Sequence, residues 1–131
     1  MDNQALLELA KQAAENSYSP YSHFAVGAAL LCSDGTVYKG CNVENVSFPA
    51  ANCAERTALF SAVADGRRDF EKIAVAAYRN RQEIVFTPPC GICRQVLSEF
   101  CGEELKIIMT DGENLVEKTL GSLLPLAFKN L

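Results

Sequence analysis

Four residues in two short segments of the sequence could build a hydrolytic zinc centre. The first segment places Cys53 two positions before Glu55, and the second contains Cys90 and Cys93 directly after two prolines. Thiolates bind zinc at about 2.3 Å, and a catalytic site uses three protein ligands and leaves a fourth position for water. Glu55 stands close enough to the lone thiolate to move the protons of that water without being a ligand. The residue types and their spacing therefore predict metal-assisted hydrolysis.

The pair Cys90 and Cys93 has two other interpretations. A Cys-x-x-Cys pair can be a redox dithiol, or it can supply half of a structural zinc site. A redox pair would not require Cys53 or Glu55, and a structural site would need a fourth ligand. The remaining cysteines are expected to be small buried apolar side chains: Cys32, Cys41 and Cys101. Neither alternative accounts for the segment around Glu55.

Both groups of candidate ligands are predicted to lie at helix starts. One helix is expected over residues 53–64 and the other over residues 90–100, because the two prolines prevent an earlier start of the second helix. Helix N-termini carry free N–H groups and a partial positive charge, which favour thiolates. Three thiolates on a dication leave a net charge of about −1. Arg56 and Gln95 are expected to hydrogen-bond to ligand sulfurs and withdraw part of this charge.

The rest of the sequence predicts the scaffold that positions these helices. Apolar runs predict strands, and an apolar stripe at helical spacing predicts a first helix over residues 4–15. The strands are expected over residues 25–31, 37–43, 72–78, 105–110 and 115–119. Strand–helix–strand units with a hairpin at each end of the chain indicate a mixed sheet. We therefore predict an α/β fold: a three-layer α/β/α sandwich with a mixed five-stranded sheet, in a single domain spanning residues 1–131.

Composition excludes several classes of function. The 131 residues are 49% hydrophobic and 21% charged, which is typical of a globular protein with a core. The net charge of −4 and the absence of a basic stripe argue against binding to nucleic acid. No segment resembles a signal peptide or reaches the roughly 20 apolar residues that a membrane span needs. We therefore expect no membrane association and a cytoplasmic protein, whose thiols stay reduced.

Five segments of the sequence resemble the cytidine deaminases of the small, homotetrameric type whose zinc ligands are all cysteine. The segments are 21–29, 40–45, 53–58, 89–95 and 123–125, and they occur in the family's order over nearly the whole chain. Zinc deaminases carry a His-x-Glu and a Pro-Cys-x-x-Cys signature. Here Cys53 stands in place of the histidine, as in the tetrameric branch. The resemblance implies a cytidine deaminase-like catalytic domain and a zinc hydrolase acting on a cyclic amidine.

The resemblance also implies a reaction and the roles of the four central residues. Cys53, Cys90 and Cys93 are expected to bind one zinc ion per chain. Glu55 is expected to take a proton from water, protonate the ring nitrogen N3 and later protonate the departing ammonia. The implied function is the hydrolytic deamination of cytidine and 2′-deoxycytidine to uridine and 2′-deoxyuridine, a step of pyrimidine salvage.

Five further residues match positions that contact the substrate in the family. Asn42 and Glu44 correspond to the pair that binds the ribose hydroxyls, and Phe24 to an aromatic that packs on the base. The backbone N–H of Ala54 is expected to bind the pyrimidine O2. Phe128 corresponds to an aromatic from a neighbouring subunit. The resemblance therefore implies a homotetramer whose active sites are shared between subunits, with a small nucleoside as substrate.

The sequence departs from the family at Pro88, where a Ser or Thr is usual. The backbone carbonyl of that residue receives the substrate's amino group, and proline keeps a carbonyl while making the loop stiffer. Activity is therefore expected to survive.

Three alternative functions remain open. A deaminase of another cytosine nucleoside, such as blasticidin S, would share the chemistry. A deaminase of nucleic acids is disfavoured by the acidic charge and by the hairpin turn at Asp111 and Gly112, which makes the last two strands antiparallel. A non-catalytic zinc module for protein interaction would surround its metal with four protein ligands.

Overall fold

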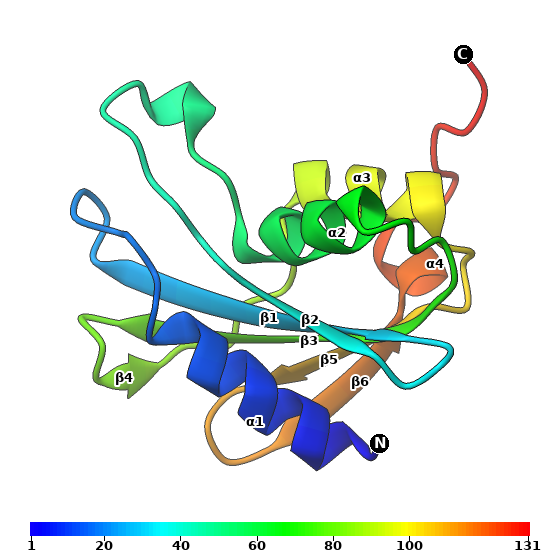
Figure 1. Cartoon of the computed structure of the whole chain (residues 1–131). Helices are drawn as coiled ribbons and strands as arrows, with labels where there is room; N and C mark the ends of the chain where they lie inside the picture. The colour runs from blue at the N-terminus through cyan, green and yellow to red at the C-terminus, as the bar shows by residue number, and fades with distance from the viewer.

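A sheet of six strands forms the centre of the fold, and helices cover both of its faces (Figure 1). The computed structural model describes all residues, 1–131. The strands lie in the order β2-β1-β3-β5-β6, and β4 pairs with β3. Their bounds are β1 (Phe24–Cys32), β2 (Val37–Cys41), β3 (Phe70–Arg79), β4 (Glu83–Ile84), β5 (Lys106–Thr110) and β6 (Leu115–Thr119).

The helices lie in two layers. Helix α1 (Asn3–Ala14) packs on one face of the sheet, whereas α2 (Ala54–Ala64), α3 (Gly91–Phe100) and α4 (Leu120–Leu123) lie over the other (Figure 1). A single 3-10 turn, η1 (Phe48–Ala50), precedes α2. The predicted three-layer α/β/α sandwich is confirmed. None of these helices is both long enough and apolar enough to span a membrane.

Side chains that alternate along the central strands fill two separate cores. In β1, Ala28 and Leu30 belong to the core of 15 buried residues under α2 and α3, and Ala29 and Leu31 belong to the core of eight under α1. Eight of the nine residues of β1 are buried. This burial on both faces explains why the strand is continuously apolar in sequence.

The sheet is mixed, as predicted, but it has six strands instead of five. Strand β1 is antiparallel to both β2 and β3, β3 is parallel to β5, and β5 is antiparallel to β6. The additional strand is β4, which pairs with the end of β3 across a turn at Asn80 and Arg81. Both turn residues have positive φ angles, 53° and 58°, which suits the tight reversal of a hairpin.

Two glycines allow a helix backbone to lie directly against a strand. A Cβ atom at Gly40 in β2 would lie 2.4 Å from Ala58 N and 2.6 Å from Ala54 O of α2. A Cβ atom at Gly27 in β1 would lie 2.0 Å from Ala10 O of α1, on the opposite face. Both glycines are therefore required by packing, and Gly40 sets the distance between the sheet and α2.

Candidate metal centre and substrate pocket

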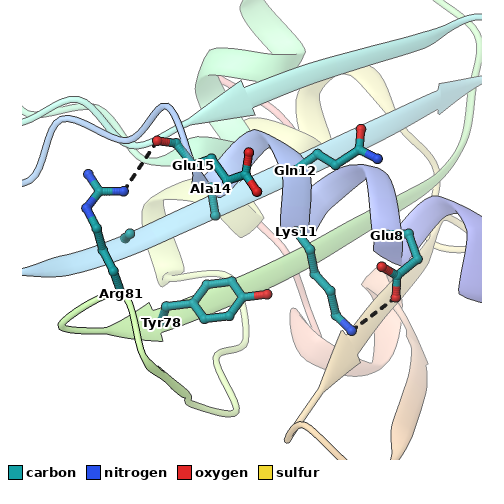
Figure 2. Close-up of a pocket in the computed structure, with 8 residues that line it drawn as sticks. Glu8, Lys11, Gln12, Ala14, Glu15, Tyr78 and Arg81 are labelled. Carbon is teal, nitrogen blue, oxygen red and sulfur yellow. Dashed lines mark hydrogen bonds and ion pairs between the residues drawn. The ribbon is translucent and has the colours of Figure 1, made fainter.

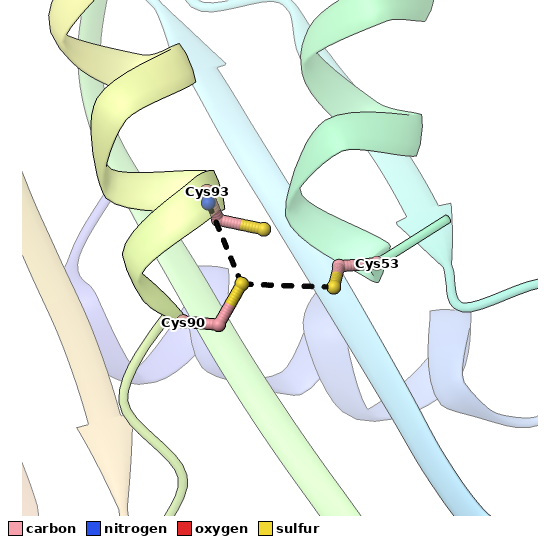
Figure 3. Close-up of side chains that lie close together, drawn as sticks. All are labelled: Cys53, Cys90 and Cys93. Atoms are coloured by element: carbon pink, nitrogen blue, oxygen red, sulfur yellow. Dashed lines mark hydrogen bonds between the residues drawn. The ribbon is translucent and has the colours of Figure 1, made fainter. Parts of the chain in front are cut away.

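Three cysteine thiols converge where α2 and α3 begin (Figure 3). Cys53 is the N-cap residue of α2, Cys90 is the N-cap residue of α3, and Cys93 lies in the first turn of α3. Their three Sγ atoms all lie within 4.8 Å of one another, and the Cys53 and Cys90 sulfurs are 3.9 Å apart. Residues that are 37 positions apart in the sequence thus meet at two helix N-termini.

The geometry and chemistry of these donors fit a zinc ion. In a tetrahedral site with zinc–sulfur bonds of about 2.3 Å, two sulfurs lie about 3.8 Å apart, close to the separation of Cys53 and Cys90. Zinc prefers thiolate ligands, and helix N-termini favour negative charge. No fourth His, Cys, Asp or Glu belongs to the group. A zinc ion held by this chain alone would therefore keep one open position, as catalytic zinc does and a closed structural site does not.

Arg56 is a cation in direct contact with the sulfur of Cys53. Its Nη2 atom donates a hydrogen bond of 3.2 Å to Cys53 Sγ, and its Nε atom is buried without a partner. Hydrogen bonding to Cys93 lowers the pKa of Cys53, burial opposes this change, and Arg56 adds to the lowering. The same pairing, together with burial, raises the pKa of Cys93. Arg56 thus hydrogen-bonds to a candidate ligand sulfur, as expected, and its effect on the charge of zinc-bound thiolates stays a prediction.

Gln95 does not hydrogen-bond to a sulfur, which differs from our expectation. Its side-chain amide donates instead to the carbonyl of Phe128, at 2.8 Å. The reason is helical geometry, because two residues after Cys93 correspond to about 200° around the helix axis. Arg56 follows Cys53 by three residues and therefore lies on nearly the same face of α2. Gln95 contacts the C-terminal segment and not the metal centre.

Glu55 lies in the first turn of α2 and is only 4% exposed. Burial raises the pKa of its carboxyl group to about 7, because a low-dielectric environment disfavours the charged form. A carboxyl group with a pKa near neutrality can both accept and return a proton. It is not one of the clustered metal-binding groups. Its position and chemistry therefore suit a proton carrier beside the metal centre.

A pocket of about 620 Å³ opens beside the cysteines and Glu55. Its volume lies in the usual range for small-molecule sites. Predicted residues that line it are Phe24, Asn42, Glu44, Cys53, Ala54, Glu55, Arg56 and Cys90. Pro88, whose carbonyl is expected to receive the substrate's amino group, lines it as well. Residues that sequence reasoning had not placed there include Ser22, Phe48, Asn52, Thr87 and Ile92. Most of these additional residues come from loops, whose side chains show no periodicity from which their direction could be predicted.

Asn42 and Glu44 both line the pocket, and hydrogen bonds fix both side chains. The Asn42 amide accepts from Val26 N at 2.9 Å and donates to Phe24 O at 2.8 Å, so it extends the contact with β1 beyond β2. Glu44 is 7% exposed and accepts hydrogen bonds from the Tyr21 N–H, the Ser22 N–H and the Ser22 hydroxyl. Burial acts to raise the pKa of Glu44, but these hydrogen bonds outweigh it and hold the pKa below its usual range. Glu44 is therefore a fixed, ionised acceptor.

Two other predicted contacts differ in their placement. The Ala54 N–H is the first in α2 and makes no hydrogen bond within the helix, so it is free to bind a ligand in the pocket. Phe128 is 65% exposed and does not line the pocket of its own chain. Its predicted role in a neighbouring subunit's site stays a prediction.

A second cavity, of about 350 Å³, lies on the opposite face of the sheet between α1 and the end of β3 (Figure 2). The Tyr78 ring forms part of its wall. Lys11 forms an ion pair with Glu8, and Arg81 donates to the backbone carbonyl of Glu15 (Figure 2). These cations are already engaged, and no cysteine lines the cavity. The clustered cysteines and Glu55 therefore lie on the other face of the sheet, on the side of α2 and α3.

Comparison with known proteins finds matches to cytidine deaminases at the level of the family, of single sequences and of a solved structure. A family model of the cytidine and deoxycytidylate deaminase zinc-binding region matches residues 1–109. Cytidine deaminase from Halalkalibacterium halodurans is 50% identical over 129 residues, which cover 98% of this chain and 95% of that protein. The one from Sporosarcina psychrophila is 47% identical and covers 98% and 92%. A crystal structure of cytidine deaminase from Burkholderia pseudomallei is 47% identical, with a TM-score of 0.90 over 98% of this chain and 100% of that one.

Proposed function

Because the chain belongs to the family of zinc-dependent cytidine and deoxycytidylate deaminases, we propose that it hydrolyses cytidine and 2′-deoxycytidine. The products are uridine, or 2′-deoxyuridine, and ammonia. The observation that carries this proposal is the convergence of three thiols and one buried carboxyl group beside a single pocket of nucleoside size. The reaction is a hydrolytic deamination, and its place is in pyrimidine salvage.

Cys53, Cys90 and Cys93 hold the zinc ion in this proposal. Bound zinc supplies Lewis acidity, which makes water a nucleophile near neutral pH. Arg56 donates to the Cys53 sulfur and so reduces the excess negative charge of three thiolates, which would otherwise weaken that Lewis acidity. The N-termini of α2 and α3 act in the same direction.

Glu55 carries the protons of the reaction. It accepts a proton from the attacking water and passes it to N3 of the cytosine ring, which makes C4 electrophilic enough for the water oxygen to add. It then takes the second proton of that water and delivers it to the amino group, so that the C4–N bond breaks and ammonia leaves. One side chain serves both steps because its pKa, raised by burial to about 7, allows transfer in either direction.

The remaining pocket residues orient the nucleoside. Glu44 is ionised and held by three donors, so it can accept a hydrogen bond from a ribose hydroxyl without moving. Asn42 lies beside it, Phe24 offers its ring to the base, and the free N–H of Ala54 binds the pyrimidine O2. Acceptors that are fixed in a pocket discriminate strongly against ligands that lack the matching hydroxyl.

The test is a direct assay of cytidine conversion to uridine. Purified protein is incubated with cytidine, and the ultraviolet change that accompanies conversion to uridine is followed. Treatment with a chelator should abolish turnover, and added Zn²⁺ should restore it. Blasticidin S serves as the comparison substrate, and cytidine should be turned over with the higher kcat/KM. Zinc-loaded protein that leaves cytidine unchanged would refute the proposal.

We also propose a homotetramer with shared active sites, in the cytoplasm. The family resemblance and the 65% exposure of Phe128 support the assembly, because an exposed aromatic at the chain end can reach a neighbouring subunit. Val46 is 84% exposed, and together with Phe48 and Ile92 it adds an apolar area that an interface would bury. All six cysteines are free, as suits a reducing compartment. Light scattering on the purified protein tests the assembly.

A further inference from the structure

The loop that leads into the metal centre has almost no hydrogen bonds of its own. Between Phe86 and Pro89, one hydrogen bond reaches the backbone, and it comes from a side chain. Pro88 and Pro89 have no N–H groups, so this part of the loop cannot donate to the scaffold. The next residue is the candidate ligand Cys90. The position of Cys90 therefore depends on contacts that residues outside the loop make with its backbone.

Arg94 supplies that one hydrogen bond. Its Nε atom donates to Pro89 O at 2.7 Å, and its Nη1 atom donates to Leu123 O at the end of α4, also at 2.7 Å. The planar guanidinium can hold two acceptors at fixed angles, which an ammonium group cannot do. One side chain thus joins the carbonyl that precedes Cys90 to a second helix.

Helix α4 is a firm anchor for this contact. Leu120 is 2% exposed, and its N–H donates to Leu105 O at 2.8 Å. The N–H of Gly121 donates to Glu103 O at 2.9 Å. Both acceptors lie between α3 and β5, so α4 is tied to the scaffold just beyond α3. Arg94 therefore links the loop to a helix that is itself fixed to the scaffold.

Arg94 forms no salt bridge, so no carboxylate neutralises its charge. A role through charge alone and a role through geometry therefore predict different results. Lysine would keep the charge, but it would not hold both carbonyls in a fixed plane. Glutamine would remove both the positive charge and the planar guanidinium that donates to the two carbonyls.

We propose that Arg94 is a positioning residue for the metal centre: it fixes the loop of Pro88 and Pro89 between α3 and α4 and so holds Cys90 in place for zinc. The same contact restrains the adjacent Pro88, which lines the substrate pocket. This second consequence rests on the proposed function, whereas the effect on zinc does not.

The experiment compares Arg94→Gln and Arg94→Lys with Arg68→Gln. Arg68 is a suitable control, because it too donates to two backbone carbonyls, Val63 O and Arg67 O, but lies away from the site. The zinc-loaded proteins are mixed with excess chromogenic chelator, and the rate of zinc release is measured. We expect release to be about 10- to 100-fold faster in both Arg94 variants and within about twofold of wild type in Arg68→Gln.

Co²⁺-substituted proteins provide a second measurement that is independent of activity. The visible spectrum should change in both Arg94 variants and stay unchanged in Arg68→Gln, because it reports the arrangement of the thiolates. If Arg94→Gln does not fold, Arg94→Lys alone decides the question. Wild-type release rates in folded Arg94 variants would overturn the proposal. Full recovery by Arg94→Lys would show that charge, and not positioning, is what Arg94 provides.

Discussion

The substitution Gly40→Ala should damage the active site by displacing α2, although Gly40 itself does not line the pocket. A Cβ atom at this position would lie 2.4 Å from Ala58 N and 2.6 Å from Ala54 O, whereas ordinary contacts begin at 3.4 Å. Both contacted atoms belong to the backbone of α2, which cannot rotate away as a side chain can. Helix α2 must therefore move from β2 by about 1 Å, the difference between 3.4 and 2.4 Å.

Helix α2 carries Glu55, and its N-cap residue is Cys53. A displacement of about 1 Å in a catalytic group can cost about 100-fold in rate, so we expect kcat/KM for cytidine to fall by about that factor. Overpacking of this kind also destabilises a protein by about 1–3 kcal/mol. Zinc content should fall below one per chain, because Cys53 would move relative to Cys90, whose sulfur is now 3.9 Å away.

The matched control is Gly27→Ala, which makes the same chemical change on the other face of the sheet. Its Cβ atom would lie 2.0 Å from Ala10 O and 2.4 Å from Ala14 N, in α1. The clash is at least as severe, but α1 carries none of the residues assigned to zinc or to substrate. We therefore expect Gly27→Ala to lose comparable stability while keeping kcat/KM within a few fold of wild type.

The assay measures two quantities for each variant. The urea midpoint is compared at one protein concentration, since assembly would make stability depend on concentration. The value of kcat/KM is measured well below the unfolding transition. If both variants lose activity in the same proportion, the approach of β2 to α2 does not position the site. If Gly40→Ala keeps full activity despite folding, α2 can shift without moving its first turn.

Three further predictions concern single side chains. Glu55→Gln should keep about one zinc ion per chain but lower kcat by about 10²- to 10⁴-fold. Metal analysis and cytidine assays measure the two quantities. Full activity of this variant would exclude Glu55 as the proton carrier. Cys53→Ala should lose zinc and thermal stability, since two thiols bind the metal weakly, and a fully metallated, active variant would contradict the ligand assignment. Burial raises the pKa of Cys101 to about 12, so the folded state holds this proton more tightly than the unfolded chain does. The contribution of this group to the free energy of unfolding is complete below about pH 9 and is lost as pH rises toward 12. The urea midpoint of Cys101→Ala should therefore decline less steeply than that of the wild type over that interval.

Strong local signals allowed much of the fold to be predicted. Helix α2 was expected over residues 53–64 and is observed over Ala54–Ala64, and the strand expected over residues 115–119 is observed with those bounds. Proline, glycine and continuous apolar runs mark such elements without help from the rest of the chain. The three cysteines were found for the same reason, because their spacing and their place at helix starts are visible in the sequence.

Elements that depend on tertiary contacts were missed or misjudged. Strand β4 has two residues, too few for any periodic pattern, and its turn contains Asn80 and Arg81 in place of the Asn-Gly that usually announces a tight hairpin. The second strand was expected to reach residue 43 but ends at Cys41. Asn42 still bonds to β1 through its N–H and its side chain, but Val43 pairs with Tyr18 and Asn52 instead of β1. Only the folded chain shows which partner an asparagine chooses.

The meeting of the metal ligands follows from the directions of the strands. Strands β2 and β3 are both antiparallel to β1, so they run parallel to each other, and their carboxyl ends lie at the same edge of the sheet. Helix α2 follows β2, and α3 follows β3 after the two-residue strand β4 and a short loop. Both helix N-termini therefore return to that edge, where ligands bind in open α/β sheets. Their partial positive charges add at the point where the three thiols converge. The topology thus favours an anionic centre here before any individual contact is considered, and Arg56 adds a hydrogen bond to the Cys53 sulfur.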